Sequence, residues 1–350
     1  MCLNALTTLL TKQDKVMNYK FFIGIDVSKS TLDFTVLTDK ELLFQLQTSN
    51  DIAGIKQFWK ELRSQKSMFL EQSLFCMEHT GIYNHHVIHF LYERQAAVCL
   101  QSSLHIKLSA GLQRGKNDKL DSLRIAQYAY KNQHELALWK PRRQVIEQLK
   151  KLTGLRSRLL NARKQLSTAL GEITCFDAAY AKNEKQLCYC SLQALNDDIR
   201  RVEEKLDQVI TSDDQLKRLF TIITSIKGIG KITAAAMIVY SNEFKDITDP
   251  KKFACYAGVA PFEHSSGSSI RKRSRVSHIA NKAMKMLLHM SAVVAITYND
   301  ELKSYYQRKV AENKNKMLVI NAVRNKLIWR VFACVKSDRL YENNYQQALV

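Results

Sequence analysis

The stretch KFFIGIDVSKSTLDFTVL, at residues 20–37, constrains the fold of this chain most strongly. Two apolar runs flank a polar turn, and Leu32, Phe34 and Val36 alternate with other residues in the second run. Alternation with a period of two is typical of β-strands, so the stretch predicts a β-hairpin. Asp26 stands between the first apolar run and the turn. We therefore expect its carboxylate at the surface of a sheet.

The order of the elements predicted after this hairpin narrows the fold class. They are a strand at 41–47, a helix capped by Asn50 or Asp51, a strand at 73–78, a helix at 81–92, a strand at 96–100 and a helix at 117–131. Three strands followed by alternating helices and strands match a ribonuclease H-like mixed α/β sheet better than a doubly wound one. We assign this domain to residues 20–140.

Pro141 marks a boundary, after which the pattern becomes helical. From 142 to about 220 the chain has no proline, almost no glycine, and apolar residues at steps of three and four. This pattern predicts long antiparallel helices or a coiled coil over 141–220, with an interruption around 171–190. Residues 221–336 are predicted to form a second globular domain that is mainly helical.

The formal net charge of +20 predicts an acidic partner for this chain of 350 residues. Nucleic acid is the first candidate and a membrane surface the second, but no apolar run approaches the ~20 residues that span a bilayer. The eight cysteines include no CxxC pair, so we expect reduced thiols in a cytoplasmic protein and no structural zinc. Composition thus favours a protein that holds a polyanion, with no membrane partner.

Four acids stand out against this basic background: Asp26, Glu78, Asp118 and Asp121. Asp26 and Glu78 follow apolar segments, where a carboxylate is costly to bury unless it is paired. The other two are three residues apart and would share one face of a helix. Hard oxygen donors suit Mg²⁺ or Mn²⁺, and two such ions about 4 Å apart stabilise an in-line displacement at phosphorus. Asp33 and Asp39 lack this apolar context, and we expect them on the surface.

A run of hydroxyl residues, SSGSS at 265–269, precedes a basic segment. The cations of that segment are Arg271, Lys272, Arg273 and Arg275. A serine in a loop beside guanidinium groups is a candidate nucleophile, with the cations stabilising charge on phosphorus oxygens. A polar loop beside a phosphate-binding stretch explains the same residues. No base is fixed by spacing, although His264 and His278 are near.

Two further segments are candidates for contact with nucleic acid. Gly228 and Gly230, followed by Lys231, form a Gly-x-Gly turn that lets backbone N–H groups approach a phosphate. A plain turn between two helices explains these glycines equally well. The predicted helix from 142 to 164 carries charges of nearly one sign, including Arg156 and Arg163, and we favour nucleic-acid contact over a solvated face.

Five motifs occur in an order that resembles a known family. They are GIDVSK, the glutamate of MEHTGIY, KNDKLDSLRIA, KGIGKITAAAMI and YAGVAPFEHSSGSSIRKR, and they cover roughly residues 20–300. Together they resemble the DEDD-type insertion-sequence transposases of the Piv/MooV invertase-like family. The resemblance implies a RuvC-like N-terminal domain in which Asp26, Glu78, Asp118 and Asp121 bind divalent metal.

The resemblance also implies a serine nucleophile in the C-terminal domain. The serine just before the glycine of the motif is Ser266, and Ser265 is the second candidate. The family implies a DNA transposase that cleaves and exchanges strands through a covalent phosphoserine. Its implied partners are double-stranded DNA of the element ends and target, a structured guide RNA from the element, and further copies of the chain in a dimer or tetramer. A cytoplasmic, nucleoid-associated bacterial protein is expected.

Three other functions are compatible with parts of the sequence. A metal-dependent, structure-specific DNA nuclease, similar to a Holliday-junction resolvase, would use the four acids without a covalent intermediate. A sugar-kinase or actin-like ATPase would need a second Gly-rich phosphate loop and an adenosine site, and we find neither. A non-catalytic coiled-coil protein that binds nucleic acid leaves the acids in apolar context unexplained. A covalent protein–DNA adduct separates the transposase from the nuclease.

Overall fold

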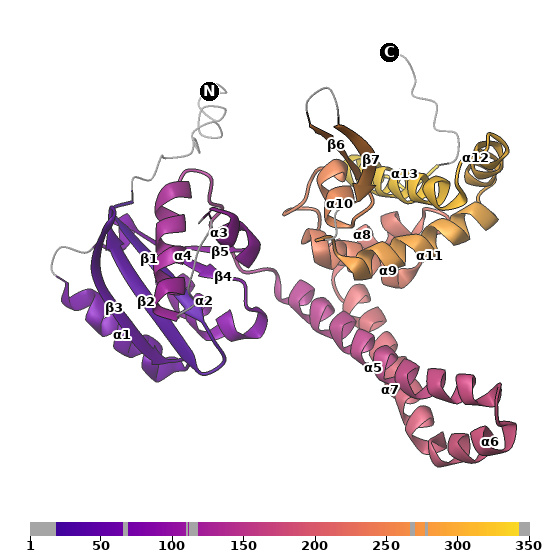
Figure 1. Cartoon of the computed structure of the whole chain (residues 1–350), viewed down its shortest axis with the longest axis horizontal. Coiled ribbons are helices and arrows are strands. Elements are labelled where there is room, and N and C mark those ends of the chain that lie inside the picture. The colour runs from indigo at the N-terminus through magenta and orange to yellow at the C-terminus, as the bar shows by residue number, and fades with distance from the viewer. Residues whose placement is uncertain are drawn as a thin grey trace, which may run out of the picture. The chain divides into compact units, whose positions relative to one another are not determined.

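In the computed structural model, the chain divides into two units between Pro141 and Arg142 (Figure 1). The structure describes residues 19–65, 69–109, 111, 118–266, 270–276 and 279–342, and for residues 118, 263–266 and 270–275 it describes the backbone alone. The helices from 142 to 220 belong to the same unit as the helices that follow them. Their assignment as a domain of their own, 141–220, separate from 221–336, stays a prediction.

The first unit is built on a five-stranded mixed sheet. Its strands are β1 (Phe21–Val27), β2 (Thr31–Thr38), β3 (Glu41–Ser49), β4 (Ser73–Glu78) and β5 (Ala97–Gln101). Their order across the sheet is β3-β2-β1-β4-β5. β1 pairs with β2, and β2 with β3, in antiparallel fashion, whereas β4 is parallel to both β1 and β5. The predicted hairpin and the predicted mixed α/β sheet are confirmed.

Helices cover both faces of this sheet. α1 (Ile52–Ser64) and α2 (His85–Glu93) contribute to the apolar core on one face, and α3 (Ser103–Ser109) and α4 (Asp118–Asn132) to the core on the other. Two short 3₁₀ turns, η1 (Leu70–Gln72) and η2 (Gly81–Asn84), precede β4 and α2. Because both faces are covered, β1 is buried along its length except at Asp26, which is half-buried.

The second unit begins with a pair of long helices. α5 (Gln144–Thr174) and α7 (Tyr189–Thr211) lie side by side, and α6 (Ala178–Leu187) joins them at one end (Figure 1). Arg156 and Arg163 of α5 contact Glu203 and Asn196 of α7, so residue numbers rise on one helix as they fall on the other. The predicted antiparallel helices are confirmed, and α6 accounts for the predicted interruption.

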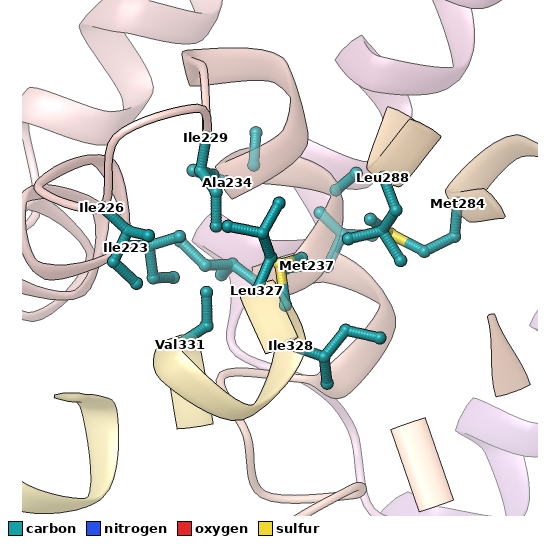
Figure 2. Close-up of a cluster of buried hydrophobic side chains, with 14 of the residues drawn as sticks. Ile223, Ile226, Ile229, Ala234, Met237, Met284, Leu288, Leu327, Ile328 and Val331 are labelled. Carbon is teal, nitrogen blue, oxygen red and sulfur yellow. The ribbon is translucent and has the colours of Figure 1, made fainter. Parts of the chain in front are cut away.

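The rest of the second unit is mainly helical, as predicted. Its helices are α8 (Asp214–Thr224), α9 (Lys231–Ser241), α10 (Pro250–Tyr256), α11 (Lys282–Tyr298), α12 (Asp300–Ala311) and α13 (Lys316–Ser337). A two-stranded ribbon, β6 (Pro261–Ser266) and β7 (Ile270–Val276), stands between α10 and α11 in the chain. Figure 2 shows part of the apolar core, in which side chains from α8, α9, α11 and α13 meet. In the described part of the chain, none of the helices combines the length and apolar character of a membrane span.

Candidate functional site

Asp26 and Glu78 lie on neighbouring parallel strands at the same end of the sheet. β1 and β4 pair with Ile25 opposite Met77, so one further step along both strands brings Asp26 beside Glu78. Phe22 packs in the core on the α4 side, and side chains of a strand change face at each residue. Asp26, four residues after Phe22, is therefore on the α4 side, and Glu78 is on the same side as its neighbour.

Gly24 lets α4 approach this part of β1 closely. A Cβ atom at Gly24 would lie 2.1 Å from the backbone oxygen of Ser122 and 2.4 Å from the backbone nitrogen of Ala126. Real Cβ contacts are never this short, so any larger residue would push the helix away from the strand. The absence of a side chain at Gly24 therefore holds the first half of α4, which carries Asp121, against the strand that carries Asp26.

A chain of hydrogen bonds, buried where Thr35 meets Ser122, joins the same helix to β2 and β3. The amide of Gln45 donates to Oγ1 of Thr35 at 2.8 Å, and Oγ1 of Thr35 is 2.7 Å from Oγ of Ser122. Ser122 donates in turn to the backbone oxygen of Lys119 at 3.1 Å, and Gln45 reaches that oxygen too, at 3.0 Å. Each hydroxyl can thus accept one bond and donate one. This polar clamp fixes the N-terminal half of α4 on the sheet.

The two acids of α4 complete the predicted set. Asp118 is the first residue of α4, and its side chain lies outside the described atoms. Asp121 forms an ion pair with Arg124, with 2.6 Å between Oδ1 and Nη1. Among the residues that the structure describes, no three His, Cys, Asp or Glu side chains gather as metal ligands would. Carboxylates are donors that Mg²⁺ and Mn²⁺ take, so the residues fit such an ion chemically. To bind it, Asp121 would exchange Arg124 for the ion.

Asp33 is buried, and the expectation of a surface position is wrong. Its exposed fraction is 4%, and it lies directly opposite Asp26 in the antiparallel pairing of β1 and β2. Both carboxylate oxygens accept hydrogen bonds from the Gln47 amide, at 2.9 and 3.1 Å. The physical reason is that helices cover both faces of the sheet, and α4 covers the face of β2 that would otherwise meet water. Asp39, at the turn after β2, is exposed as expected.

Ser265 and Ser266 lie in a strand, whereas the sequence predicted a loop. In the antiparallel ribbon, Ser265 is opposite Arg271 and Ser266 is opposite Ile270. The other predicted cations, Lys272, Arg273 and Arg275, are also on β7. The backbone register therefore runs the basic strand alongside the two candidate serines. Residues 267–269 and His278 lie outside the described residues.

The predicted Gly-x-Gly turn lies between α8 and α9. Gly228 has a φ of +101°, and a Cβ there would be 2.8 Å from the backbone oxygen of Ser291 on α11, so this glycine serves close packing. Gly230 is exposed and begins α9 without a side-chain cap, which leaves the first backbone N–H groups of the helix without that partner. Lys231 forms an ion pair with Asp207 at 2.8 Å. Contact of this turn with a phosphate stays a prediction.

Several cations of α5 have partners within the protein. Arg156 forms an ion pair with Glu203 at 2.7 Å, and Arg163 donates to Oδ1 of Asn196 at 3.0 Å. These contacts hold α5 to α7 and neutralise part of the charge that the sequence assigned to nucleic acid. The role of Arg156 and Arg163 in binding nucleic acid stays a prediction.

Arg143 ties the start of α5 to the helical domain. It forms ion pairs with Asp213, which caps α8, and with Glu243, at 3.1 Å in the latter case. The side chain of Glu243 is fully buried. The backbone N–H of Leu216, and then the Arg143 guanidinium, hold the pKa of Asp213 below its usual value. The charge at this position therefore serves the fold.

A contact between buried Arg324 on α13 and half-buried His289 on α11 was not predicted from the sequence. Arg324 is 5% exposed, and its Nη2 lies 2.6 Å from Nδ1 of His289. Because a guanidinium can only donate, Nδ1 accepts and the other ring nitrogen carries the proton. Burial, and then the charge of Arg324, lower the pKa of His289. The imidazole is thus held neutral, in one tautomer.

Two family models match this chain. A DEDD transposase model of IS110 elements matches residues 23–173, which include Asp26, Glu78 and α4. A second model, described as transposase of the IS116/IS110/IS902 family, matches residues 220–307. This segment includes the Gly-x-Gly turn and the serine ribbon, that is, the pair of strands β6 and β7 that carries Ser265 and Ser266. Each model thus covers one of the two regions in which the sequence placed candidate chemistry.

Individual proteins match as well. The chain is 25% identical to a pilin gene-inverting protein of Moraxella lacunata over 336 residues, which is 94% of this chain and 99% of that protein. The protein of the same name from Moraxella bovis is 24% identical over the same shares. A 43.6 kDa protein of insertion element IS110 from Streptomyces coelicolor is 26% identical over 44% of this chain and 36% of its own length. The chain therefore carries the DEDD transposase domains of the IS110/IS116 family and is homologous to the pilin gene-inverting proteins.

Proposed function

We propose that this protein is the DNA transposase of a mobile insertion sequence, which cleaves and exchanges DNA strands with a serine nucleophile and divalent metal. The observation that carries the proposal is the register of β1 and β4 beneath α4. It sets Asp26 beside Glu78, under the helix that bears Asp118 and Asp121, inside the segment matched by the DEDD transposase model.

In this proposal the first unit is a ribonuclease H-like, RuvC-like domain. The strand order β3-β2-β1-β4-β5, with three antiparallel strands followed by two parallel ones, supports that assignment. Asp26, Glu78, Asp118 and Asp121 would hold Mg²⁺ or Mn²⁺. When bound there, the cation would stabilise charge on the oxygens of the scissile phosphate.

The second unit would supply the nucleophile. Oγ of Ser266 attacks phosphorus, a new P–O bond forms, and the bond to the leaving sugar oxygen breaks, with that oxygen taking a proton. A sugar hydroxyl of another strand then attacks the phosphoserine and releases Ser266, so strands are exchanged without an external energy source. The basic strand β7, which pairs with the serine strand, supports this assignment because its cations can hold phosphate oxygens.

The partners in this proposal are the double-stranded DNA of the element ends and target, a structured guide RNA from the element, and further copies of the chain. The net charge of +20 supports a polyanionic partner. Gly230 and Lys231 at the start of α9, and Arg156 and Arg163 on α5, are proposed contacts with nucleic acid. A cytoplasmic, nucleoid-associated location fits these partners.

The experiment that tests the proposal is a search for the covalent intermediate. Purified protein is incubated with element-end DNA, the flanking transcript and Mg²⁺, and the products are separated on denaturing gels. The proposal predicts a protein–DNA adduct that is lost in Ser266→Ala and kept in Ser265→Ala, which serves as the matched control.

Two results would overturn this proposal in different ways. An adduct that persists in Ser266→Ala and disappears in Ser265→Ala would move the nucleophile by one residue. Cleaved DNA ends without any adduct would favour a metal-dependent, structure-specific nuclease that works by hydrolysis. Adding EDTA should prevent adduct formation in the wild-type protein, because the acids would then hold no cation.

A further inference from the structure

Asp33 is a buried ionisable side chain beside Asp26, a residue of the proposed metal site. It lies opposite Asp26 on the adjacent antiparallel strand, where Cβ atoms of facing residues are about 4.5–5.5 Å apart. Leu32 and Phe34, its neighbours along β2, are buried in the core on the other face. Asp33 therefore shares the α4 face with Asp26.

Two successive steps of β2 and β3 have the same construction. At the first, Thr35 faces Gln45, and at the second, Asp33 faces Gln47, with the glutamine amide donating to the β2 residue in both. The Thr35 step continues into α4 through Ser122, so its role is to fix the helix. Among the residues that the structure describes, Asp33 has side-chain hydrogen bonds with Gln47 alone. Thr35 thus contacts both Gln45 and α4, whereas the described side-chain hydrogen bonds of Asp33 are with Gln47 alone.

A contact with Gln47 does not by itself require an ionisable carboxylate at position 33. A neutral acceptor such as threonine or asparagine could receive the same amide, as Thr35 does, at a lower cost of burial. The described residues provide no cationic partner for Asp33 within ion-pair distance. Like charges directly opposite on a sheet repel each other, so a divalent cation near Asp26 and Asp33 would stabilise this end of the sheet.

We propose that Asp33, oriented by Gln47, is a fifth carboxylate of the acid site and strengthens divalent-cation binding by the four acids. The inference rests on the proposed function, because it concerns the same cation. Asp33 acts as a positioning residue: its buried charge, fixed in direction by two hydrogen bonds, raises the affinity of the neighbouring carboxylates for a cation. The cation class is a hard divalent ion, Mg²⁺ or Mn²⁺.

The test is a titration of the full chain with Mn²⁺, in which free Mn²⁺ is measured by electron paramagnetic resonance. It is run with and without element-end DNA. Asp33→Asn keeps the shape of the side chain and an acceptor for Gln47 but removes the charge. Asp39→Asn removes one charge from the exposed turn of the same hairpin and is the matched control. Asp26→Asn tests the acid site itself.

We expect the Kd for Mn²⁺ to rise about tenfold in Asp33→Asn, and to stay unchanged in Asp39→Asn. A purely structural role for Asp33 would lower the melting temperature of Asp33→Asn in EDTA. Relief of repulsion predicts a melting temperature in EDTA that is equal or higher, with a smaller increase on addition of Mn²⁺. The increase in melting temperature on addition of Mn²⁺ measures the Mn²⁺ affinity separately from any change in the stability of the metal-free protein.

The outcomes separate this inference from the proposed function. An unchanged Mn²⁺ affinity in Asp33→Asn, together with a weakened one in Asp26→Asn, would refute the role of Asp33 and leave the acid site intact. Two results would refute the metal site and the inference with it. One is an unchanged Mn²⁺ affinity in both variants, and the other is no binding of Mn²⁺ to the wild-type chain with or without element-end DNA.

Discussion

The two units of this protein bring their candidate chemistry together in different ways. In the first, the proposed acids come from three elements, and the position of α4, which carries two of them, depends on its close contact with β1 at Gly24. In the second, Ser265 and Ser266 and the basic strand are neighbours in one short ribbon. A close contact at Gly228 packs the second core but lies in the turn before α9. Core changes should therefore disrupt the acid site in the first unit and stability alone in the second.

The largest effect is expected from Gly24→Val. The new side chain meets the backbone of α4 at 2.1 Å, so the helix must move or the unit must unfold. We expect a loss of stability of at least about 3 kcal/mol and loss of Mn²⁺ binding, because α4 carries two of the acids. Chemical denaturation and Mn²⁺ titration check this. Gly171→Ala in α5, where a Cβ meets nothing within 4 Å, should leave Mn²⁺ binding unchanged and should not lower stability, because alanine favours a helix more than glycine does.

Gly228→Ala should cost about 2–3 kcal/mol, because alanine rarely adopts a φ of +101° and its Cβ would press on α11. In contrast to the change at Gly24, it should leave the Mn²⁺ affinity unaltered. Gly230→Ala, with open space around the Cβ, is the matched control for stability. A large loss of Mn²⁺ binding in Gly228→Ala would contradict this expectation, since it would couple the second core to the acid site.

Thr35→Val tests the polar clamp without changing the size of the side chain. Ser122 and Gln45 lose their shared partner in a buried place, so we expect a loss of about 1–2 kcal/mol. Mn²⁺ affinity should fall several-fold, because the first half of α4 becomes less fixed. Thr38→Val, at the far end of β2, provides the comparison. Equal Mn²⁺ affinity in the two variants would show that Gly24 alone positions the helix.

A pH dependence of stability is expected from His289. Its pKa is lowered in the folded state, first by burial and then by Arg324, whereas an unfolded histidine titrates near about 6.5. As the pH falls through that value the unfolded state binds the proton first, so this contribution is complete above about 6.5 and is lost below it. In His289→Gln, which keeps an acceptor for Arg324, stability should vary less between pH 7 and 5. The exposed His105→Gln should follow the wild-type profile.

The smallest effect on stability is expected at Arg156. Arg156→Gln and Glu203→Gln both remove the same ion pair between α5 and α7, at a cost below about 1 kcal/mol. If Arg156 also contacts a phosphate, only Arg156→Gln should reduce the salt dependence of DNA binding, by about one unit of slope. Identical slopes in the two variants would assign this arginine to the fold alone.

Much of the first unit could be predicted from the sequence because its strands carry local signals. The alternation of Leu32, Phe34 and Val36 predicted β2, and the apolar runs before Asp26 and Glu78 predicted β1 and β4. The burial of Asp33 could not be predicted in this way. It depends on α4, which follows in the chain more than eighty residues later and covers that face. Leu32, Phe34 and Val36 all point to the core on the other face, so their alternation did not indicate that the face of Asp33 is covered as well.

The serine ribbon was missed for a different reason. Its strands, PFEHSS and IRKRSRV, are polar and basic, so neither alternation nor an apolar run marks them. Glycine and serine are typical of turns and loops, and the cross-strand pairing that forms the ribbon leaves no periodic signal in this composition. The pair of Arg324 and His289 was also hidden, because contacts between distant helices have no fixed spacing.

In the proposed function, the acids of the first unit and the serine of the second serve one reaction. The covalent protein–DNA adduct should therefore be measured in Asp26→Asn, with Asp39→Asn as the control for charge. We expect no adduct in Asp26→Asn, even though Ser266 is intact, and wild-type amounts in Asp39→Asn. Wild-type adduct formation in Asp26→Asn would contradict this proposal, because the serine would then react without the acid site.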